Sequence, residues 1–219
     1  MEIITTADGS HTLASPYADE HYHSKHGALQ EGRHVFIQHG VAALAPRSRS
    51  EIRILEMGFG TGLNALLTWR YGQEQQRRIF YASIEAQPVP AEVVRMLNYE
   101  ALVPGAKEIF TQLHRAPWDK AIELTELFCL QKRHAMLEKI ELEPHFDIVY
   151  YDAFGPSCQP ELWTPSIFAK LYASLVNGGF LVTYCAKGQV KRDLRSVGFE
   201  VIGLPGPPGK REITKAIKA

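Results

Sequence analysis

The chain has 219 residues, with 24 basic and 24 acidic side chains and a hydrophobic fraction of 45%. This length suits one domain that buries roughly 70% of its unfolded surface, and the composition excludes a mainly disordered chain. No apolar run approaches the roughly 18–20 residues that span a bilayer, and Met1 to Thr6 do not form a secretory signal. The net charge of zero gives no global electrostatic argument for a nucleic-acid partner.

Cysteine usage favours a cytoplasmic location. Cys129, Cys158 and Cys185 are odd in number and widely spaced, and they form no C-x-x-C pair. Neither a disulfide framework nor a cysteine zinc site is expected from such a set. We therefore interpret the three thiols as small core residues or bystanders.

The composition divides the chain into two parts. Residues 1–45 form a polar, His-rich N-terminal extension or lid, and residues 46–219 form the predicted domain. From Ile52 onward, short apolar runs that end in glycine or an acid alternate with segments of helical period. This alternation is typical of βα units.

The predicted elements follow one another to the C-terminus. Strands are expected at 52–57, 79–84, 128–130, 146–151, 180–185, 199–204 and 211–217. Helices are expected from Leu63 to about Gly72, after Pro90, from Thr164 to the stop at Asn177-Gly178-Gly179, and from about Gln189 to Val197. The sequence thus predicts an α/β fold with one doubly wound, mostly parallel, seven-stranded, Rossmann-like sheet.

A glycine-rich turn separates the first predicted strand from its helix. It has the spacing Gly58-x-Gly60-x-Gly62 and is preceded by Glu56. Glycines let the backbone approach a ligand closely, and the helix N-terminus behind them offers free N–H groups. Glu85, at the end of the second strand, is placed to accept hydrogen bonds from ribose hydroxyls. These features favour a nucleoside-like ligand over a plain turn, whereas a dinucleotide site needs G-x-G-x-x-G.

The segment 56–64, Glu-Met-Gly-Phe-Gly-Thr-Gly-Leu-Asn, resembles the methyl-donor loop of class I S-adenosylmethionine-dependent methyltransferases. A narrower resemblance covers nearly the whole chain: it is to the methyltransferase domain of MnmC-type tRNA-modification proteins and their free-standing relatives. The segments that carry it are Tyr22–Glu31 with Val35-Phe36, Tyr151–Pro156, Pro160–Thr164, Gly178-Gly179, Gly188–Arg192 and Gly209–Glu212.

This resemblance implies a class I methyltransferase fold and S-adenosyl-L-methionine as methyl donor. The residues expected to bind the donor are Glu56, Gly58, Phe59, Gly60, Thr61, Gly62, Asn64, Glu85 and His134. His134 follows the third strand, where many class I methyltransferases place an acid against the adenine amine. A backbone contact is the alternative at this point.

The same resemblance implies methylation of the exocyclic amine of 5-aminomethyl-(2-thio)uridine at the wobble position of tRNA. Bifunctional members carry a C-terminal flavin oxidase domain that first removes a carboxymethyl group. Because the sequence ends at Ala219, we expect no FAD here and a separate enzyme that supplies the aminomethyl-uridine precursor. No metal is expected, since amine methylation needs none and the spacing His21-x-His23-x-x-His26 suits a flexible loop equally well.

Asp152, at the end of the predicted strand 146–151, is the predicted catalytic residue. A primary alkylamine is mostly protonated at neutral pH, and an ammonium has no lone pair with which to attack a methyl group. A carboxylate beside the donor would attract this ammonium, orient it and accept its proton. The alternative is a turn or cap acid without chemistry, and the choice between base and positioning group stays open.

Aromatic residues near Asp152 are candidates for contact with the substrate. Phe154 and Trp163 flank the predicted site and suit base stacking, although both suit a core position equally well. Pro156 shapes the turn after Asp152, and Tyr22 belongs to the predicted lid.

Positive charge gathers near the C-terminus. From Lys187 to Ala219, eight basic residues stand against three acidic ones, a local charge of +5. Lys187, Lys210 and Arg211 are the candidates for contact with the substrate RNA, because Lys and Arg supply most phosphate contacts. A solvated charged face is the alternative.

Three other functions compete with tRNA methylation. The neutral overall charge and the lack of a separate RNA-binding domain favour a class I transferase for a small-molecule amine. A non-catalytic RNA-binding relative is the second, against which the intact glycines, Glu85 and Asp152 argue. A nicotinamide dehydrogenase is disfavoured by the glycine spacing. The sequence gives no oligomeric state.

Overall fold

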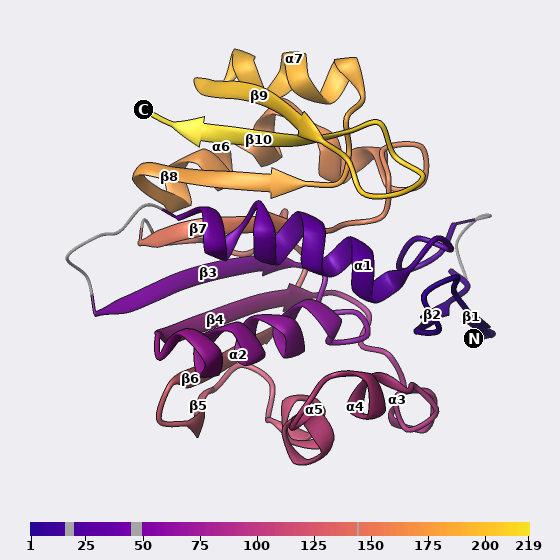
Figure 1. The fold of residues 1–219 in the computed structure, drawn as a ribbon. Helices are drawn as coiled ribbons and strands as arrows, with labels where there is room; N and C mark the ends of the chain where they lie inside the picture. The colour runs from indigo at the N-terminus through magenta and orange to yellow at the C-terminus, as the bar shows by residue number, and fades with distance from the viewer. Residues whose placement is uncertain (16–19, 45–49, 144) are drawn as a thin grey trace.

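The computed structural model describes residues 1–15, 20–44, 50–143 and 145–219. One central sheet has the strand order β5-β6-β4-β3-β7-β8-β10-β9, and a small two-stranded sheet lies near the N-terminus (Figure 1). The central strands are β3 (Glu51–Met57), β4 (Arg78–Glu85), β5 (Ala121–Thr125), β6 (Phe128–His134), β7 (Phe146–Tyr151), β8 (Leu175–Thr183), β9 (Phe199–Pro205) and β10 (Glu212–Lys218). The small sheet consists of β1 (Ile3–Thr5) and β2 (His11–Leu13).

Helices cover both faces of the central sheet (Figure 1). One face carries α1 (Ala28–Gly32), the π-helix Arg33–Gln38, α2 (Leu63–Gln75) and α5 (Ala106–Arg115), and the other carries α6 (Pro165–Ser174) and α7 (Gly188–Ser196). The short helices are 3-10 turns at Val41–Ala43 and Pro160–Trp163 with α3 (Ala91–Val94) and α4 (Tyr99–Leu102). This arrangement confirms the predicted α/β, doubly wound class. No helix within the described ranges is long and apolar enough to cross a membrane.

The predicted number of seven strands is wrong, because the central sheet has eight. The additional strand, β5, pairs antiparallel with β6 at the edge of the sheet. Its residues are exposed or half-buried, so it has no continuous apolar run for a sequence pattern to detect. The sheet is also mixed, since β10 runs antiparallel to both β8 and β9.

The predicted stop of α6 is misplaced. The helix begins as expected, with the Ile167 amide donating to Thr164 Oγ1 at 3.5 Å, but it ends at Ser174. Asn177-Gly178-Gly179 lies inside β8, where the pairing with β7 shifts register between Phe146 and Ile148. Gly178 has a φ of +69°, and a Cβ at Gly179 would lie 2.8 Å from the Val176 carbonyl oxygen. The glycines therefore accommodate extra strand residues rather than end a helix.

Residues before the central sheet contribute to its core. Leu13, Ala28, Val35 and Phe36 are buried in the same hydrophobic cluster as β3 and β4. Their side chains pack on the sheet face that α2 also covers. The predicted boundary at 45/46 lies outside the described residues, and the division into extension and domain stays a prediction.

Phe36→Ala tests how far this segment supports the fold. Phe36 is 1% exposed, so we expect truncation to lower the free energy of unfolding by about 3–5 kcal/mol. Met96→Ala is the control, because Met96 is 54% exposed and its truncation should change stability by less than about 0.5 kcal/mol. Chemical denaturation measures the free energy of unfolding of both variants. If Phe36→Ala were as stable as the wild type, the residues before the sheet would not support its core.

Candidate active site

The strand order reverses between β3 and β7, and a pocket of about 580 Å³ opens at the carboxyl ends of β3, β4 and β7. Open α/β sheets bind ligands at such a reversal, since loops that leave in opposite directions separate there. Parts of the N-terminal segment, residues 20–25, and of the β9–β10 loop complete the wall.

The glycine turn forms one side of the pocket. Gly58, Gly60 and Gly62 all have positive φ, at +87°, +49° and +73°. A Cβ at Gly60 would lie 3.1 Å from the Tyr22 ring, so the turn needs glycine both for its conformation and for this close approach. The Gly60 amide donates to Glu85 Oε2 at 3.0 Å, which fixes the turn to the end of β4.

Glu85 faces the pocket while it holds the turn. Its Oε1 accepts the Gln87 amide at 2.7 Å, and burial raises the pKa of its carboxyl although the Gln87 and Gly60 amides oppose this shift. Glu56 lies beneath the turn, 1% exposed, and accepts the Ser83 hydroxyl at 2.7 Å. Burial raises the pKa of Glu56 to about 8. Glu56 therefore supports the turn from inside the core, whereas Glu85 is available to a ligand.

Sequence reasoning missed two residues that brace the same turn. His114 Nε2 lies 3.1 Å from the Thr61 carbonyl oxygen, and Lys132 Nζ donates to the His114 carbonyl at 2.9 Å. The Lys132 ammonium also lies 5.1 Å from the centre of the Phe59 ring, and its burial lowers its pKa to about 8. No signal in the sequence indicated this role, because Lys132 follows the short apolar run 128–130 within a polar stretch.

Asp152 lies across the pocket from Glu85. Its Oδ2 accepts the Asn64 amide group at 2.7 Å, and its backbone amide donates to the Met57 carbonyl at 3.3 Å. Desolvation raises the pKa of the Asp152 carboxyl well above its usual range, and the negative charge of Glu31 adds to this shift. The carboxyl is therefore a much stronger proton acceptor than an exposed aspartate.

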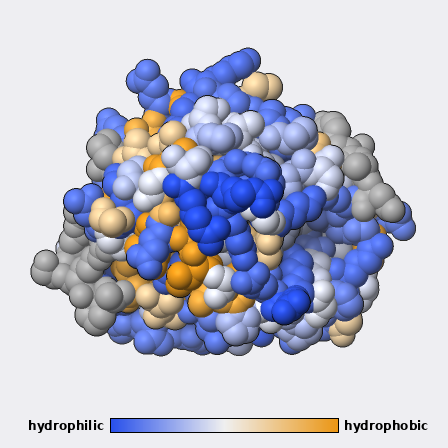
Figure 2. Space-filling view, turned by 90° about the horizontal axis from the view of Figure 1, so that it is seen from above, coloured by the Kyte–Doolittle hydropathy of each residue, from blue (hydrophilic) through white to orange (hydrophobic). Residues whose placement is uncertain are grey.

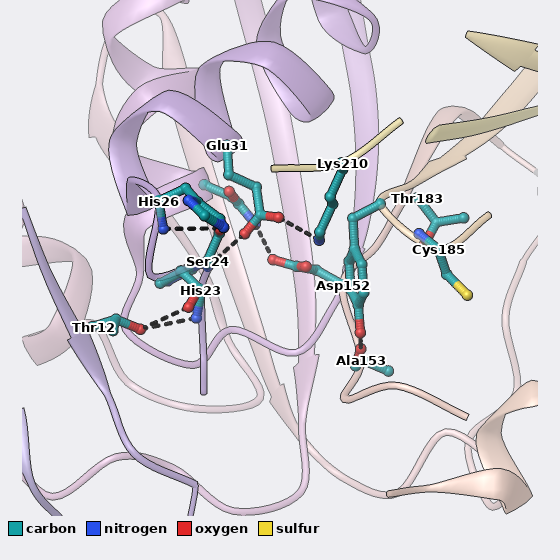
Figure 3. Close-up of polar contacts among 12 residues, drawn as sticks. Thr12, His23, Ser24, His26, Glu31, Asp152, Ala153, Thr183, Cys185 and Lys210 are labelled. Atoms are coloured by element: carbon teal, nitrogen blue, oxygen red, sulfur yellow. Dashed lines mark hydrogen bonds and ion pairs between the residues drawn. The ribbon is translucent and has the colours of Figure 1, made fainter. Parts of the chain in front are cut away.

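An ion pair that the sequence did not predict lies beside Asp152 (Figure 3). Lys210 Nζ is 2.5 Å from Glu31 Oε1, and the Ser24 amide donates to Glu31 Oε2 at 2.8 Å. Lys210 was predicted as an RNA contact, whereas here its ammonium points into the pocket, 4.0 Å from the centre of the Tyr184 ring. Glu31 was missed because it belongs to the polar lead-in, whose fold the sequence did not define.

Most of the predicted site residues meet in this pocket. Those that line it are Tyr22, Gly58, Phe59, Gly60, Thr61, Asn64, Glu85, Asp152, Phe154, Pro156, Lys187 and Lys210. The other predicted site residues do not line the pocket as far as the structure describes it: they are Glu56, Gly62, His134, Trp163 and Arg211. Tyr22 and Phe154 contact each other edge to face, with ring centres 5.0 Å apart.

Three of the residues outside the pocket have other contacts. Trp163 is buried and donates its indole N–H to the Phe154 carbonyl at 2.8 Å, which is the core position that the sequence left open. The His134 ring packs on Trp118, with Nε2 3.3 Å from the Ala86 carbonyl, and residues 135–137 line the pocket in its place. Arg211 is exposed beside Leu204.

The histidines of the His21-x-His23-x-x-His26 pattern belong to the N-terminal segment beside the pocket. In the part of the chain that the structure describes, no group of three or more His, Cys, Asp or Glu side chains is arranged to hold a metal ion. His23 Nε2 instead lies 2.8 Å from the Thr61 hydroxyl, and burial lowers the pKa of His23 to about 4. His23 thus connects the N-terminal segment to the glycine turn.

Comparison with known proteins places this site in a family. Residues 99–219 match a family of S-adenosyl-L-methionine-dependent methyltransferases. The chain is 36% identical over 98% of its length to the tRNA 5-methylaminomethyl-2-thiouridine biosynthesis bifunctional protein MnmC of Cupriavidus metallidurans, and 34% identical to that of Cupriavidus necator. It spans about a third of the length of these curated relatives: 33% and 34%.

A solved structure agrees with these relatives. The crystal structure of MnmC2 from Aquifex aeolicus superposes with a TM-score of 0.80 and 28% sequence identity, over 98% of this chain and 69% of that one. The resemblance to MnmC-type methyltransferases that the sequence suggested is thereby confirmed. The architecture is a class I methyltransferase fold with a mixed eight-stranded sheet.

Glu85→Gln tests the predicted role of Glu85 in donor binding. Loss of the charged acceptor should weaken the binding of S-adenosyl-L-methionine about tenfold or more, since hydrogen bonds to charged groups contribute roughly 1.5–3 kcal/mol. Isothermal titration calorimetry measures the affinity. The matched control is Glu108→Gln on the exposed side of α5, which should bind the donor as the wild type does. An unchanged affinity of Glu85→Gln would contradict this assignment.

Proposed function

The chain belongs to this family of S-adenosyl-L-methionine-dependent methyltransferases, and from that membership we propose that it methylates the exocyclic amine of 5-aminomethyl-(2-thio)uridine at the wobble position of tRNA. The observation that carries the proposal is the Asp152 carboxylate, which lies in one pocket with the glycine turn and Glu85. The relatives' names supply the nucleoside, because they refer to the biosynthesis of 5-methylaminomethyl-2-thiouridine in tRNA.

The residues of the pocket fit the donor. The close backbone approach at Gly60 and the carboxylate of Glu85 suit a nucleoside with free ribose hydroxyls. We assign Gly58, Phe59, Gly60, Thr61, Asn64 and Glu85 to donor binding, and Glu56 and Gly62 to support of the turn. In the place of His134, residues 135–137 are the wall available to the adenine. When bound, S-adenosyl-L-methionine supplies an electrophilic methyl group.

Asp152 acts on the amine. Its carboxylate attracts the substrate ammonium and orients it, and the raised pKa of Asp152 lets the carboxyl take up the ammonium proton. Because Asn64 engages Oδ2, Oδ1 is the atom left for the amine. The deprotonated nitrogen then carries the lone pair that methyl transfer requires.

Phe154 and the pocket rim form the substrate side. We propose that Phe154, held edge-on by Tyr22, stacks on the splayed-out uridine base. Lys187 is exposed at the rim of the pocket, where its ammonium donates to Ser157 Oγ at 2.9 Å. We propose Lys187 as a phosphate contact, and Arg211, which is exposed outside the pocket lining, as a second one.

The basic C-terminal stretch contributes less free charge than its sequence suggests. Lys191 pairs with Glu212 at 2.6 Å, Lys215 lies over the Phe180 ring at 3.6 Å, and Lys218 donates to backbone carbonyls. Figure 2 looks down on the edge formed by α7, β9 and β10 and shows a mostly hydrophilic face with an apolar patch.

The proposal includes tRNA as partner in the cytoplasm, and the substrate presupposes an earlier enzyme that installs the aminomethyl group.

Asp152→Asn provides the test of this function. Wild type and variant are incubated with labelled S-adenosyl-L-methionine and tRNA from cells that lack the protein, and nucleosides are analysed by mass. We expect one added methyl group on 5-aminomethyl-uridine and a rate about 10²–10⁴ times lower in the variant, with donor binding retained. Asp193→Asn, in α7, should keep the full rate.

A wild type that binds the donor and methylates free polyamines, but leaves this tRNA unchanged, would overturn the tRNA proposal. If Asp152→Asn methylated this tRNA at the wild-type rate, the proposed substrate would stand, but the proposed role of Asp152 in the reaction would be wrong.

A further inference from the structure

The Glu31–Lys210 ion pair lies inside the proposed amine site, and nothing in the reaction described above uses it. The Glu31 side chain is 8% exposed and that of Lys210 is 30% exposed, so the pair is largely withdrawn from solvent. The Tyr184 ring beneath Lys210 donates its hydroxyl to the carbonyl of Ala153, the residue after Asp152. Ion pairs at an exposed surface contribute little, but one shielded in a pocket acts on every charge beside it.

The loop that carries Lys210 is held in place by its own backbone. The Gly206 amide donates to the Arg211 carbonyl at 3.2 Å, and the Lys210 amide donates to the Pro207 carbonyl at 2.9 Å. Gly209 has a φ of +85°, and a Cβ there would overlap the His26 ring. The loop is therefore packed against the N-terminal segment, and Lys210 meets Glu31 in a defined geometry.

Opposite charges act on Asp152 from the elements packed around it. The groups that act on it are Glu31 from α1, Glu56 from β3, Tyr81 from β4, Tyr184 after β8, Lys210 from the β9–β10 loop, and the amide of Asn64 from α2. Glu20 of the N-terminal segment lines the same pocket and accepts the Gly155 amide at 3.0 Å. Glu31 and Lys210 influence the Asp152 carboxyl in opposite directions, Glu31 towards the neutral form and Lys210 towards the charged form. Tyr81 and Tyr184 are neutral over the working pH range, because burial raises the pKa of each.

We propose that Glu31 and Lys210 are positioning residues that reserve Asp152 for the amine: Lys210 neutralises Glu31, and a cationic amine then pairs with Asp152. This inference rests on the proposed function and deepens it, because it explains how the site selects one ammonium group. Without Lys210, two carboxylates share a poorly solvated pocket and one of them takes up a proton. Without Glu31, the Lys210 ammonium pairs with Asp152 and repels the substrate cation.

The test is the titration of Asp152 in variants that change one charge at a time. Lys210→Met removes the neighbour that favours the carboxylate, so the acidic limb of the pH profile of kcat/KM should move to higher pH by roughly one unit. Glu31→Gln removes the neighbour that favours the neutral acid, so the limb should move to lower pH. Glu31→Gln with Lys210→Met should return the limb close to its wild-type position.

Two controls separate this effect from damage to the fold. Lys210→Arg keeps the charge and should keep the wild-type limb. Lys191→Met breaks the ion pair between Lys191 and Glu212, whose 2.6 Å separation is close to that of the Glu31–Lys210 pair. Neither Lys191 nor Glu212 is among the residues that line the pocket as far as the structure describes it, so this variant should leave the titration of Asp152 unchanged. If Lys210→Met does not fold, the shift in Glu31→Gln, which preserves side-chain shape, decides the question.

A second readout needs no tRNA. The carboxyl carbon of Asp152, assigned by comparison with Asp152→Asn, is titrated by NMR in ¹³C-aspartate-labelled protein. Changes of opposite sign in the pKa of Asp152 in Lys210→Met and Glu31→Gln would support the inference. They would do so even if the wild type methylated no tRNA, a result that would contradict only the proposed function. No shift in either variant, or shifts in the same direction, would overturn the inference.

Discussion

The site depends on the parallel register of three strands. Met57 at the end of β3 is level with Ile84 of β4 on one side and with Tyr151 of β7 on the other. The chain therefore turns out of the sheet at three adjacent points, and the amides of Gly58 and Asp152 bond to the neighbouring strand ends at 2.9 and 3.3 Å. Gly58 has a φ of +87°, a backbone conformation that favours glycine, and its Cα lies next to the Asp152 carbonyl. This register brings the proposed donor and amine sites into one pocket.

Burying acids around that pocket requires compensation from distant parts of the chain. Glu56, Glu85 and Asp152 all have raised pKa values because they are withdrawn from water. Backbone amides fix Glu85, the Ser83 hydroxyl fixes Glu56, and the Asn64 amide fixes Asp152. Since burying a polar or charged group without a partner is costly, these hydrogen bonds stabilise each acid in its position.

The sequence could predict the residues that local pattern places at strand ends. The glycine turn, Glu85 and Asp152 each follow an apolar run directly, and parallel strands bring such ends to one edge. It could not predict the edge strand β5, since a half-exposed strand has no apolar run, nor the use of Gly178 inside β8 instead of after α6. Nor could it tell that Trp163 turns into the core, because an aromatic residue near a site suits both positions.

Glu31 and Lys132 were hidden for a different reason, since their roles exist only through contacts between elements distant in sequence. Lys210 reaches Glu31 across nearly the whole chain, and Lys132 reaches the glycine turn through His114. The N-terminal segment takes part in both the core and the pocket: Phe36 is buried against the sheet, and Glu31 lies five residues earlier on the same continuous helical stretch. The packing that stabilises the fold therefore also fixes the carboxylate beside Asp152. We expect substitutions in this stretch to act on stability and on the charge of the proposed amine site together, and a measurement that titrates Asp152 separates the two effects.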